Sequence, residues 1–394
     1  MRSEREYPPY VSYLIVTVMS VAMLAVQTTI PFKVKELGGG FDAVGFLFTW
    51  ASFWYVASGF LLGKVSHHIG PRRTMLATLA ICATLAIAVS QTTALWQLYV
   101  ILAGYYVSIC LFWIASEHAS TGMHTNLTIV QSTSIYGVAF TLGNAGGLLV
   151  STSLQRHTLA VPFFVAIGLM LVVFALTWIT VSPRAGFHRS TTEDVAAFPE
   201  EARTRLRRSM LASRIGLVGA YGTNAVAMLF LPRYLWEQLG YAKPLAGFLT
   251  CLVTLAMAIA FAVHGLRTGW IHRLLPVRVA PFVAGAALLV AGSFRQPVVI
   301  AVGTIIIGLA AGTAYVHNLY YALEEPGQRA RRAGIHEALI GIAFMVPPLL
   351  GGFLTRATRN PQTIFWIGAG LAVALGLAQN VVLSFTRKPA TLRP

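Results

Sequence analysis

Charged residues are scarce in this sequence. Asp, Glu, Lys and Arg make up 11% of the 394 residues, whereas 56% of the residues are hydrophobic. A typical soluble domain carries about 25% charged residues, so the composition excludes an ordinary water-soluble protein. We therefore predict an all-α integral membrane protein whose surroundings are the lipid bilayer.

Cysteine is also rare, and the patterns of several common activities are missing. The three cysteines, Cys82, Cys110 and Cys251, all lie within apolar runs, so a disulfide framework is not expected. The sequence has no H-E-x-x-H zinc pattern, no nucleophile elbow and no Walker phosphate loop. We therefore expect neither an enzyme nor an ATP-driven pump, and no metal or cofactor.

Long apolar runs, by contrast, fill the chain. A helix needs about 20 apolar residues to cross a bilayer. Twelve runs meet this length, and they are predicted to be transmembrane helices at 12–31, 43–63, 73–90, 95–116, 131–153, 161–181, 214–231, 245–264, 278–294, 297–321, 334–354 and 363–385.

The basic residues are distributed unevenly among the loops. If the N-terminus starts inside the cell, most of the 29 Lys and Arg residues fall on the cytoplasmic side. This positive-inside pattern predicts that both termini lie in the cytoplasm. We separately expect a multi-pass protein of the inner (plasma) membrane, because the termini are compact and carry no evident targeting extension. The net charge of +16 then reflects orientation, and no nucleic-acid partner is expected.

Short patterns recur half a chain apart. IYGVAF at 135–140 corresponds to LIGIAF at 339–344, and ILAG at 101–104 corresponds to IIIG at 305–308. The repeat predicts two pseudo-symmetric six-helix bundles, residues 1–181 and 214–394, joined by a cytoplasmic linker at 182–213. Parallel repeats of this kind are typical of transporters whose substrate site lies between the halves.

The segment GKVSHHIGPRR (Gly63–Arg73) resembles a signature of the major facilitator superfamily, in which G-x-x-x-D-R-x-G-R-R joins helices two and three. GNAGG at 143–147 and PPLLGG at 347–352 are similar to that family's helix-five signature. The resemblance extends over essentially the whole chain. It implies that the loop controls the inner gate, with candidate gating residues Gly63, His67, His68, Gly70, Arg72 and Arg73.

The resemblance also implies that this loop packs against the start of the helix at 334–354. His336 and Glu337 are expected in the first turn of that helix, where its dipole favours an acid. One hypothesis makes Glu337 the acid of a gating latch, with His67, His68 or Arg72 as its cationic partner. The alternative is that His336 and Glu337 form a solvated helix start near the lipid headgroups.

In the family, helices one, four, seven and ten line the substrate cavity. Polar and aromatic residues of the corresponding runs are therefore candidates for substrate binding. Tyr, Trp and Asn in such runs also serve as interfacial anchors or link two helices. The candidates are Gln27, Tyr106, Trp113, Tyr221, Asn224, His317, Asn318 and Tyr321.

The 13 acids are expected in loops or at span ends, with Glu117 and Glu337 the deepest. Without a carboxylate or a cation at the midplane, the cavity is expected to favour a small neutral or amphiphilic organic molecule. Glu117, His118 and Glu337 are candidates for proton coupling. For Glu117 and His118, the alternative is a boundary of the span at the cytoplasm.

Together these features predict a monomeric secondary active or facilitative transporter of a small-molecule substrate. It would work by rocker-switch alternating access, either as a uniporter or coupled to protons. The alternative is a transporter-like receptor or assembly protein that binds a ligand without moving it.

Overall fold

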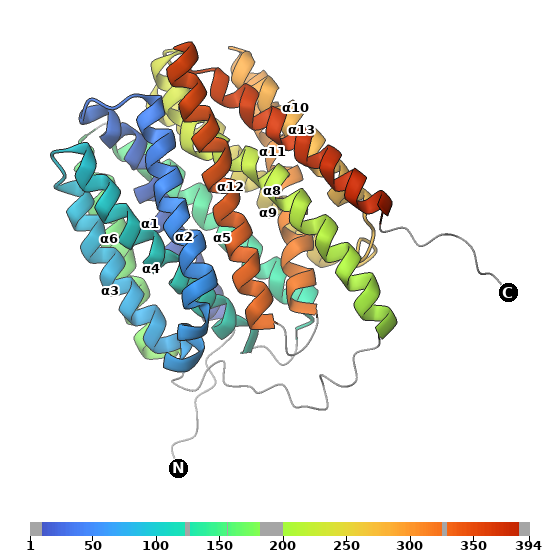
Figure 1. Ribbon diagram of the computed structural model, residues 1–394. Helices are drawn as coiled ribbons and strands as arrows, with labels where there is room; N and C mark the ends of the chain where they lie inside the picture. The colour runs from blue at the N-terminus through green and yellow to red at the C-terminus, as the bar shows by residue number, and fades with distance from the viewer. Residues whose placement is uncertain (1–9, 123–126, 156, 182–199, 325–328, 386–394) are drawn as a thin grey trace.

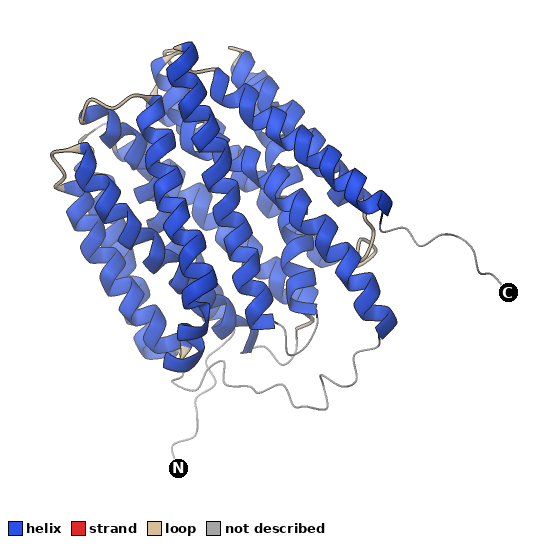
Figure 2. Cartoon of the chain, in the orientation of Figure 1, coloured by secondary structure: helices blue, strands red, loops and turns tan. Residues whose placement is uncertain are grey.

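The computed structural model describes residues 10–122, 127–155, 157–181, 200–324 and 329–385 (Figure 1). Within these ranges the chain is helical, with short connections and no strand (Figure 2). The helices are α1 (Tyr10–Glu36), α2 (Phe41–Ile69), α3 (Pro71–Ser90), α4 (Leu95–Gly122), α5 (Ile129–Leu154), α6 (Ala160–Thr180), α8 (Glu200–Glu237), α9 (Lys243–Leu266), α10 (Leu275–Ser293), α11 (Pro297–Glu324), α12 (Arg329–Thr358) and α13 (Thr363–Phe385).

Twelve helices of the described chain are long and apolar enough to cross a membrane. In a bilayer a helix satisfies its own backbone hydrogen bonds, which is why an apolar run of this length folds as a helix. Each helix coincides with one of the twelve predicted runs, so the all-α, twelve-span fold is confirmed. The chain is a multi-pass membrane protein.

Two helices begin more than one helical turn before their apolar runs. Helix α8 begins at Glu200 rather than near 214, and α12 begins at Arg329 rather than near 334. The added turns are rich in Glu, Ala and Arg, which favour helix although they are too polar to count as a membrane span. Glu337 is consequently not in the first turn of its helix, and the expected interaction with the end of the helix dipole is wrong.

The two sets of six helices, α1–α6 and α8–α13, meet along two pairs of helices. Helix α2 packs along α12, and α5 packs along α9 (Figure 1). Glycine permits both contacts: a Cβ on Gly45 would lie 2.5 Å from the carbonyl oxygen of Pro348, and one on Gly247 would lie 1.9 Å from the Thr152 hydroxyl. These pairs hold the halves together at the level of the membrane.

The halves are also joined at the end of the bundle where α1 leads into α2. Lys35 of α1 forms an ion pair of 2.8 Å with Glu237 of α8. The guanidinium of Arg233, also on α8, donates to the carbonyl oxygens of Pro31, Gly39 and Gly40 at 3.3–3.4 Å. These contacts join the halves at this end, which we call the α1–α2 end.

Candidate functional site: a cavity between the two halves

A cavity lies between the two sets of helices. The empty space between its walls amounts to about 730 Å³, a volume that includes the part open to solvent. Its wall is mainly aromatic and aliphatic, with a few polar groups. The aromatic lining residues are Tyr55, Tyr106, Trp113, Tyr136, Phe140, Tyr221, Tyr315 and Phe344, and the polar ones include Gln27, Ser52, Asn144, Asn224, Thr254 and Glu337.

Five of the predicted substrate-binding residues are among those that line the cavity. Gln27 comes from α1, Tyr106 and Trp113 from α4, and Tyr221 and Asn224 from α8. All five side chains are buried, so they face the interior of the bundle rather than the lipid interface. Both halves therefore contribute to the wall.

The other three predicted binding residues, His317, Asn318 and Tyr321, are not in the lining, which corrects the expectation for α11. His317 packs its ring 4.4 Å from the ring of Trp270, and its Nδ1 lies 2.8 Å from the Thr313 carbonyl oxygen. The Tyr321 hydroxyl accepts a hydrogen bond from the His272 backbone at 2.9 Å. The polar stripe of α11 faces its own half of the molecule.

Asn318 has a different role, because it connects three helices. Its side-chain nitrogen donates to the Ser213 hydroxyl of α8 at 3.0 Å, and its side-chain oxygen lies 2.7 Å from His336 Nδ1 of α12. Since the oxygen can only accept, this contact places the proton of a neutral His336 on Nδ1. The polar side chains of α8, α11 and α12 are thus linked beside the cavity.

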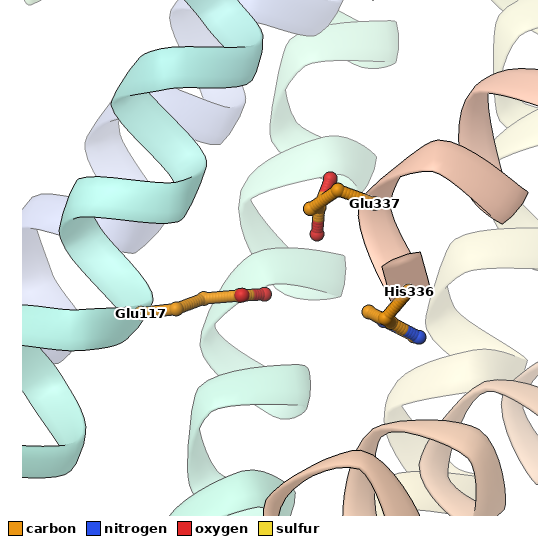
Figure 3. A group of neighbouring side chains, drawn as sticks. All are labelled: Glu117, His336 and Glu337. Carbon is orange, nitrogen blue, oxygen red and sulfur yellow. The ribbon is translucent and has the colours of Figure 1, made fainter. Parts of the chain in front are cut away.

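Two buried carboxyl groups face each other, and one of them, Glu337, lines the cavity. Glu117 of α4 and Glu337 of α12 point toward one another, with His336 next to them (Figure 3). The hydroxyl of Tyr55 on α2 donates a hydrogen bond to the Glu337 carboxylate. Glu117 and Glu337 are 6% and 3% exposed. Glu117 lies at the end of its span, as predicted, whereas the alternative of a solvated helix start at His336 and Glu337 is wrong because both residues are buried.

The proposed latch partners of Glu337 are not beside it where the structure describes them. Arg72 donates to the Trp178 carbonyl oxygen at 2.6 Å and lies over the Trp178 ring. Gly70, with φ 91°, is the N-cap of α3 and takes the left-handed conformation that glycine tolerates. Arg73 is exposed. The gating residues Gly63, His67 and His68 and the coupling candidate His118 lie outside the residues whose side chains are described.

The carboxyl–imidazole cluster is also a candidate for holding a cation. Ligand atoms of Glu117, His336 and Glu337 all lie within 4.8 Å of one another. No metal was expected from the sequence, and this geometry does not require one.

Several lining residues were missed at the level of sequence. Tyr136, Phe140 and Asn144 of α5 follow one another at steps of four and all line the cavity. That spacing places them on one face of a helix, and it was the signal that could have identified them. Tyr55 gave no such signal, because α2 was not among the helices expected to line the cavity.

A cavity lined from both halves of a two-bundle membrane protein is the arrangement of a membrane transporter that binds a small molecule between its halves. The sequence matches the Major Facilitator Superfamily over residues 12–328. The chain belongs to this family, and family membership points to a transporter rather than an enzyme. No curated protein sequence matches the chain.

Solved structures with the same fold include transporters of different substrates. The nucleoside transporter NupG is similar with a TM-score of 0.70 at 13% identity, and the likeness covers 96% of this chain and 99% of that one. A mutant of NupG gives 0.67 at 16% identity, with 94% and 99% covered. The human organic anion transporter MFSD10 (TETRAN) gives 0.66 at 17% identity, with 96% and 100% covered. At these identities the likeness shows the fold alone.

Proposed function

We propose that this protein is a proton-coupled secondary transporter that carries a small organic molecule by rocker-switch alternating access. The observation that carries the proposal is that Glu117 and Glu337, one from each half, face each other, with Glu337 in the wall of the central cavity. A group that senses both the proton and the separation of the halves has the position required for coupling.

Proton binding follows from the free-energy cost of burying two charged carboxylates. Two like charges a few ångströms apart away from water repel strongly, and no Lys or Arg is among the described residues that line the cavity. A proton shared by the pair removes this repulsion while the halves are together. Rocking the halves apart separates the two carboxyl groups and exposes them to water, so it changes their affinity for that proton. The other titratable groups around the two carboxyl groups are His336, Tyr55, Cys110, Tyr136, Tyr221 and Tyr315.

The closed α1–α2 end supplies the second element of alternating access. Arg233, Lys35 and Glu237 join the halves there and block one route to the cavity. In the other state of the cycle these contacts would break, while the glycine contacts between α2 and α12 and between α5 and α9 allow the halves to rock. We place the protein in the inner (plasma) membrane with both termini in the cytoplasm, an orientation that rests on the positive-inside pattern. In this orientation the α1–α2 end is the external end. The transporter would work as a monomer without a nucleic-acid partner.

A cross-linking experiment tests the proposal. The ligand is first found by thermal unfolding in detergent with a panel of nucleosides, sugars, organic anions and amines, because a ligand at about 100 times its Kd adds about 2.7 kcal/mol to the native state. Cysteines are then placed at Lys35 and Glu237, whose side chains are 2.8 Å apart. The three native cysteines are buried. The protein cross-linked by a cleavable bifunctional reagent should still bind the ligand but should carry no flux into proteoliposomes. Cleavage of the cross-link should restore the flux.

The controls separate the alternatives. The single Lys35→Cys protein treated with the same reagent should transport normally. Undiminished flux in the cross-linked protein would contradict alternating access, and ligand binding without flux before cross-linking would favour the receptor alternative. Coupling is tested by Glu117→Gln, which should lose uptake driven by an imposed pH gradient and keep exchange of labelled for unlabelled ligand.

A further inference from the structure

We infer that the ligand of the cavity is an amphiphilic organic cation, an amine in its protonated form. The inference deepens the proposed function and rests on it in taking this cavity as the transport site. It replaces the expectation of a neutral ligand, which assumed that no carboxyl group lies deep in the membrane. Three independent features of the wall support it: its charge, its aromatic surface and its unpaired acceptors.

The charge of the wall is negative or zero. Among the described lining residues, Glu337 is the single acidic or basic residue, and no Asp, Lys, Arg or His accompanies it. Glu117 lies next to it in the same cluster. A buried carboxylate is costly unless a cation is close to it. A ligand ammonium next to Glu337 would supply that cation. An anionic ligand would add a further negative charge to the cluster with no basic side chain to balance it.

The aromatic part of the wall suits both ends of an amphiphilic cation. Rings follow one another around the cavity: Trp113 lies 5.3 Å from Phe140, Phe140 lies 6.3 Å from Tyr315, and Tyr315 lies 5.5 Å from Tyr221. The face of an aromatic ring attracts an ammonium group within about 6 Å. The same rings exclude water from an apolar body. Tyr315 also lies 4.7 Å from His336, so this aromatic surface extends to the acidic cluster.

Four polar groups of the wall have no hydrogen-bond partner among the described residues: the hydroxyls of Ser52 and Tyr106, which can donate or accept, and two amide oxygens, which can only accept. The side-chain oxygens of Asn144 on α5 and Asn224 on α8 are buried without a hydrogen bond, and these residues are 6% and 3% exposed. Both residues line the cavity. A buried carbonyl oxygen without a donor costs stability, and the N–H groups of a primary or secondary ammonium would satisfy it. The wall therefore favours a protonated amine over a quaternary ammonium ion.

The test compares three probes with the same apolar body and different head groups: 4-phenylbutylamine, 4-phenylbutanol and 4-phenylbutanoate. Their dissociation constants for the full-length protein in detergent are measured by calorimetry at neutral pH, where the amine is protonated and the acid ionised. We expect the amine to bind at least about tenfold more tightly than either of the others, as close charge pairs do in buried interfaces. Equal affinities for the amine and the alcohol, or a preference for the acid, would overturn the inference.

Variants show whether Glu337 carries the preference. Glu337→Gln keeps the shape of the side chain and should reduce the preference for the amine over the alcohol to about threefold or less. The matched control is Glu36→Gln, which removes an acid whose side chain is 52% exposed at the end of α1 and should leave the preference unchanged. A preference that persists in Glu337→Gln would refute the assignment. If that variant does not fold, the affinities of the three probes for the unmodified protein still decide whether the ligand is a cation.

The inference and the proposed function can fail separately. If proteoliposomes take up the alcohol or the acid and not the amine, the protein is a transporter and the inferred substrate class is wrong. If the amine binds selectively through Glu337 but no ligand of the panel is moved, the substrate class survives and the transport function does not.

Discussion

Arg233 offers the most direct test of how the closed end is held. Its guanidinium is buried, with the residue 4% exposed, and donates to three carbonyl oxygens of the other half at 3.3–3.4 Å. It also lies over the ring of Phe41, 4.4 Å from its centroid. Its ion pair with Glu237 is within α8, so that pair does not join the halves. We therefore expect Arg233→Met to open the α1–α2 end.

The size of the effect follows from these contacts. A hydrogen bond to a charged group contributes about 1.5–3 kcal/mol at good geometry, but 3.3–3.4 Å is longer than the usual 2.7–3.2 Å, so we take about 0.5–1 kcal/mol for each. The contact with Phe41 adds about 0.5–1 kcal/mol. Losing the set favours opening by about 2–4 kcal/mol, a change of roughly 30- to 700-fold in the ratio of open to closed molecules. The remaining Lys35–Glu237 pair is partly exposed and is worth about 1 kcal/mol or less.

The measurement is the distance between spin labels at two exposed turn positions of this end, Gln91 in the first half and Gln296 in the second. Arg233→Met should move most of the distance distribution to longer values. The control is Arg356→Met, which removes an exposed basic residue from the last turn of α12 at the same end. An unchanged distribution in Arg233→Met, or an equal shift in both variants, would refute the assignment of the closure to Arg233.

Two further predictions concern packing. A Cβ added at Gly247 would already lie 1.9 Å from the Thr152 hydroxyl, so we expect Gly247→Leu to destabilise the protein by about 1–3 kcal/mol and to lower its melting temperature in detergent. The control is Gly168→Leu, because a Cβ added at Gly168 meets nothing within 4 Å, and this variant should melt as the unmodified protein does. Asn318→Leu removes the acceptor of His336 and should cost about 1–3 kcal/mol, so melting at an unchanged temperature would show that this link does not stabilise the bundle.

The fold was predictable because the bilayer allows few solutions. Length and apolarity were enough to locate all twelve helices, since a spanning segment must satisfy its backbone internally. The starts of α8 and α12 were not predictable in this way. Hydropathy shows where the apolar part of a helix begins, whereas the helices themselves begin earlier, at Glu200 and Arg329. The division at 182–213 remains a prediction for residues 182–199, which lie outside the described chain.

The site was predictable only in part, because helix rotation decides which residues reach the cavity. On α4, Tyr106 and Trp113 lie on the face that turns to the centre, and both reach the cavity. On α11 the corresponding reasoning favoured His317 and Asn318, but Tyr315 is the α11 residue that lines it. A stripe of polar residues shows that a helix has a special face. It does not show which neighbour that face meets, since Asn318 serves contacts to α8 and α12 just as well.

The positions of Glu117 and Glu337 explain why a sequence reading assigns them to the boundary and the structure places them inside. Each acid lies near the end of an apolar run, where hydropathy alone puts the edge of the membrane. The helices that carry them continue beyond the acids, α4 to Gly122 and α12 from Arg329, and the two acids, one from each half, face each other. Hydropathy along one run cannot register this arrangement, because it depends on how the two halves pack. In the proposed transport cycle, moving the halves apart would change the surroundings of both carboxyl groups, and a difference in proton or cation affinity between the two states is what coupling requires.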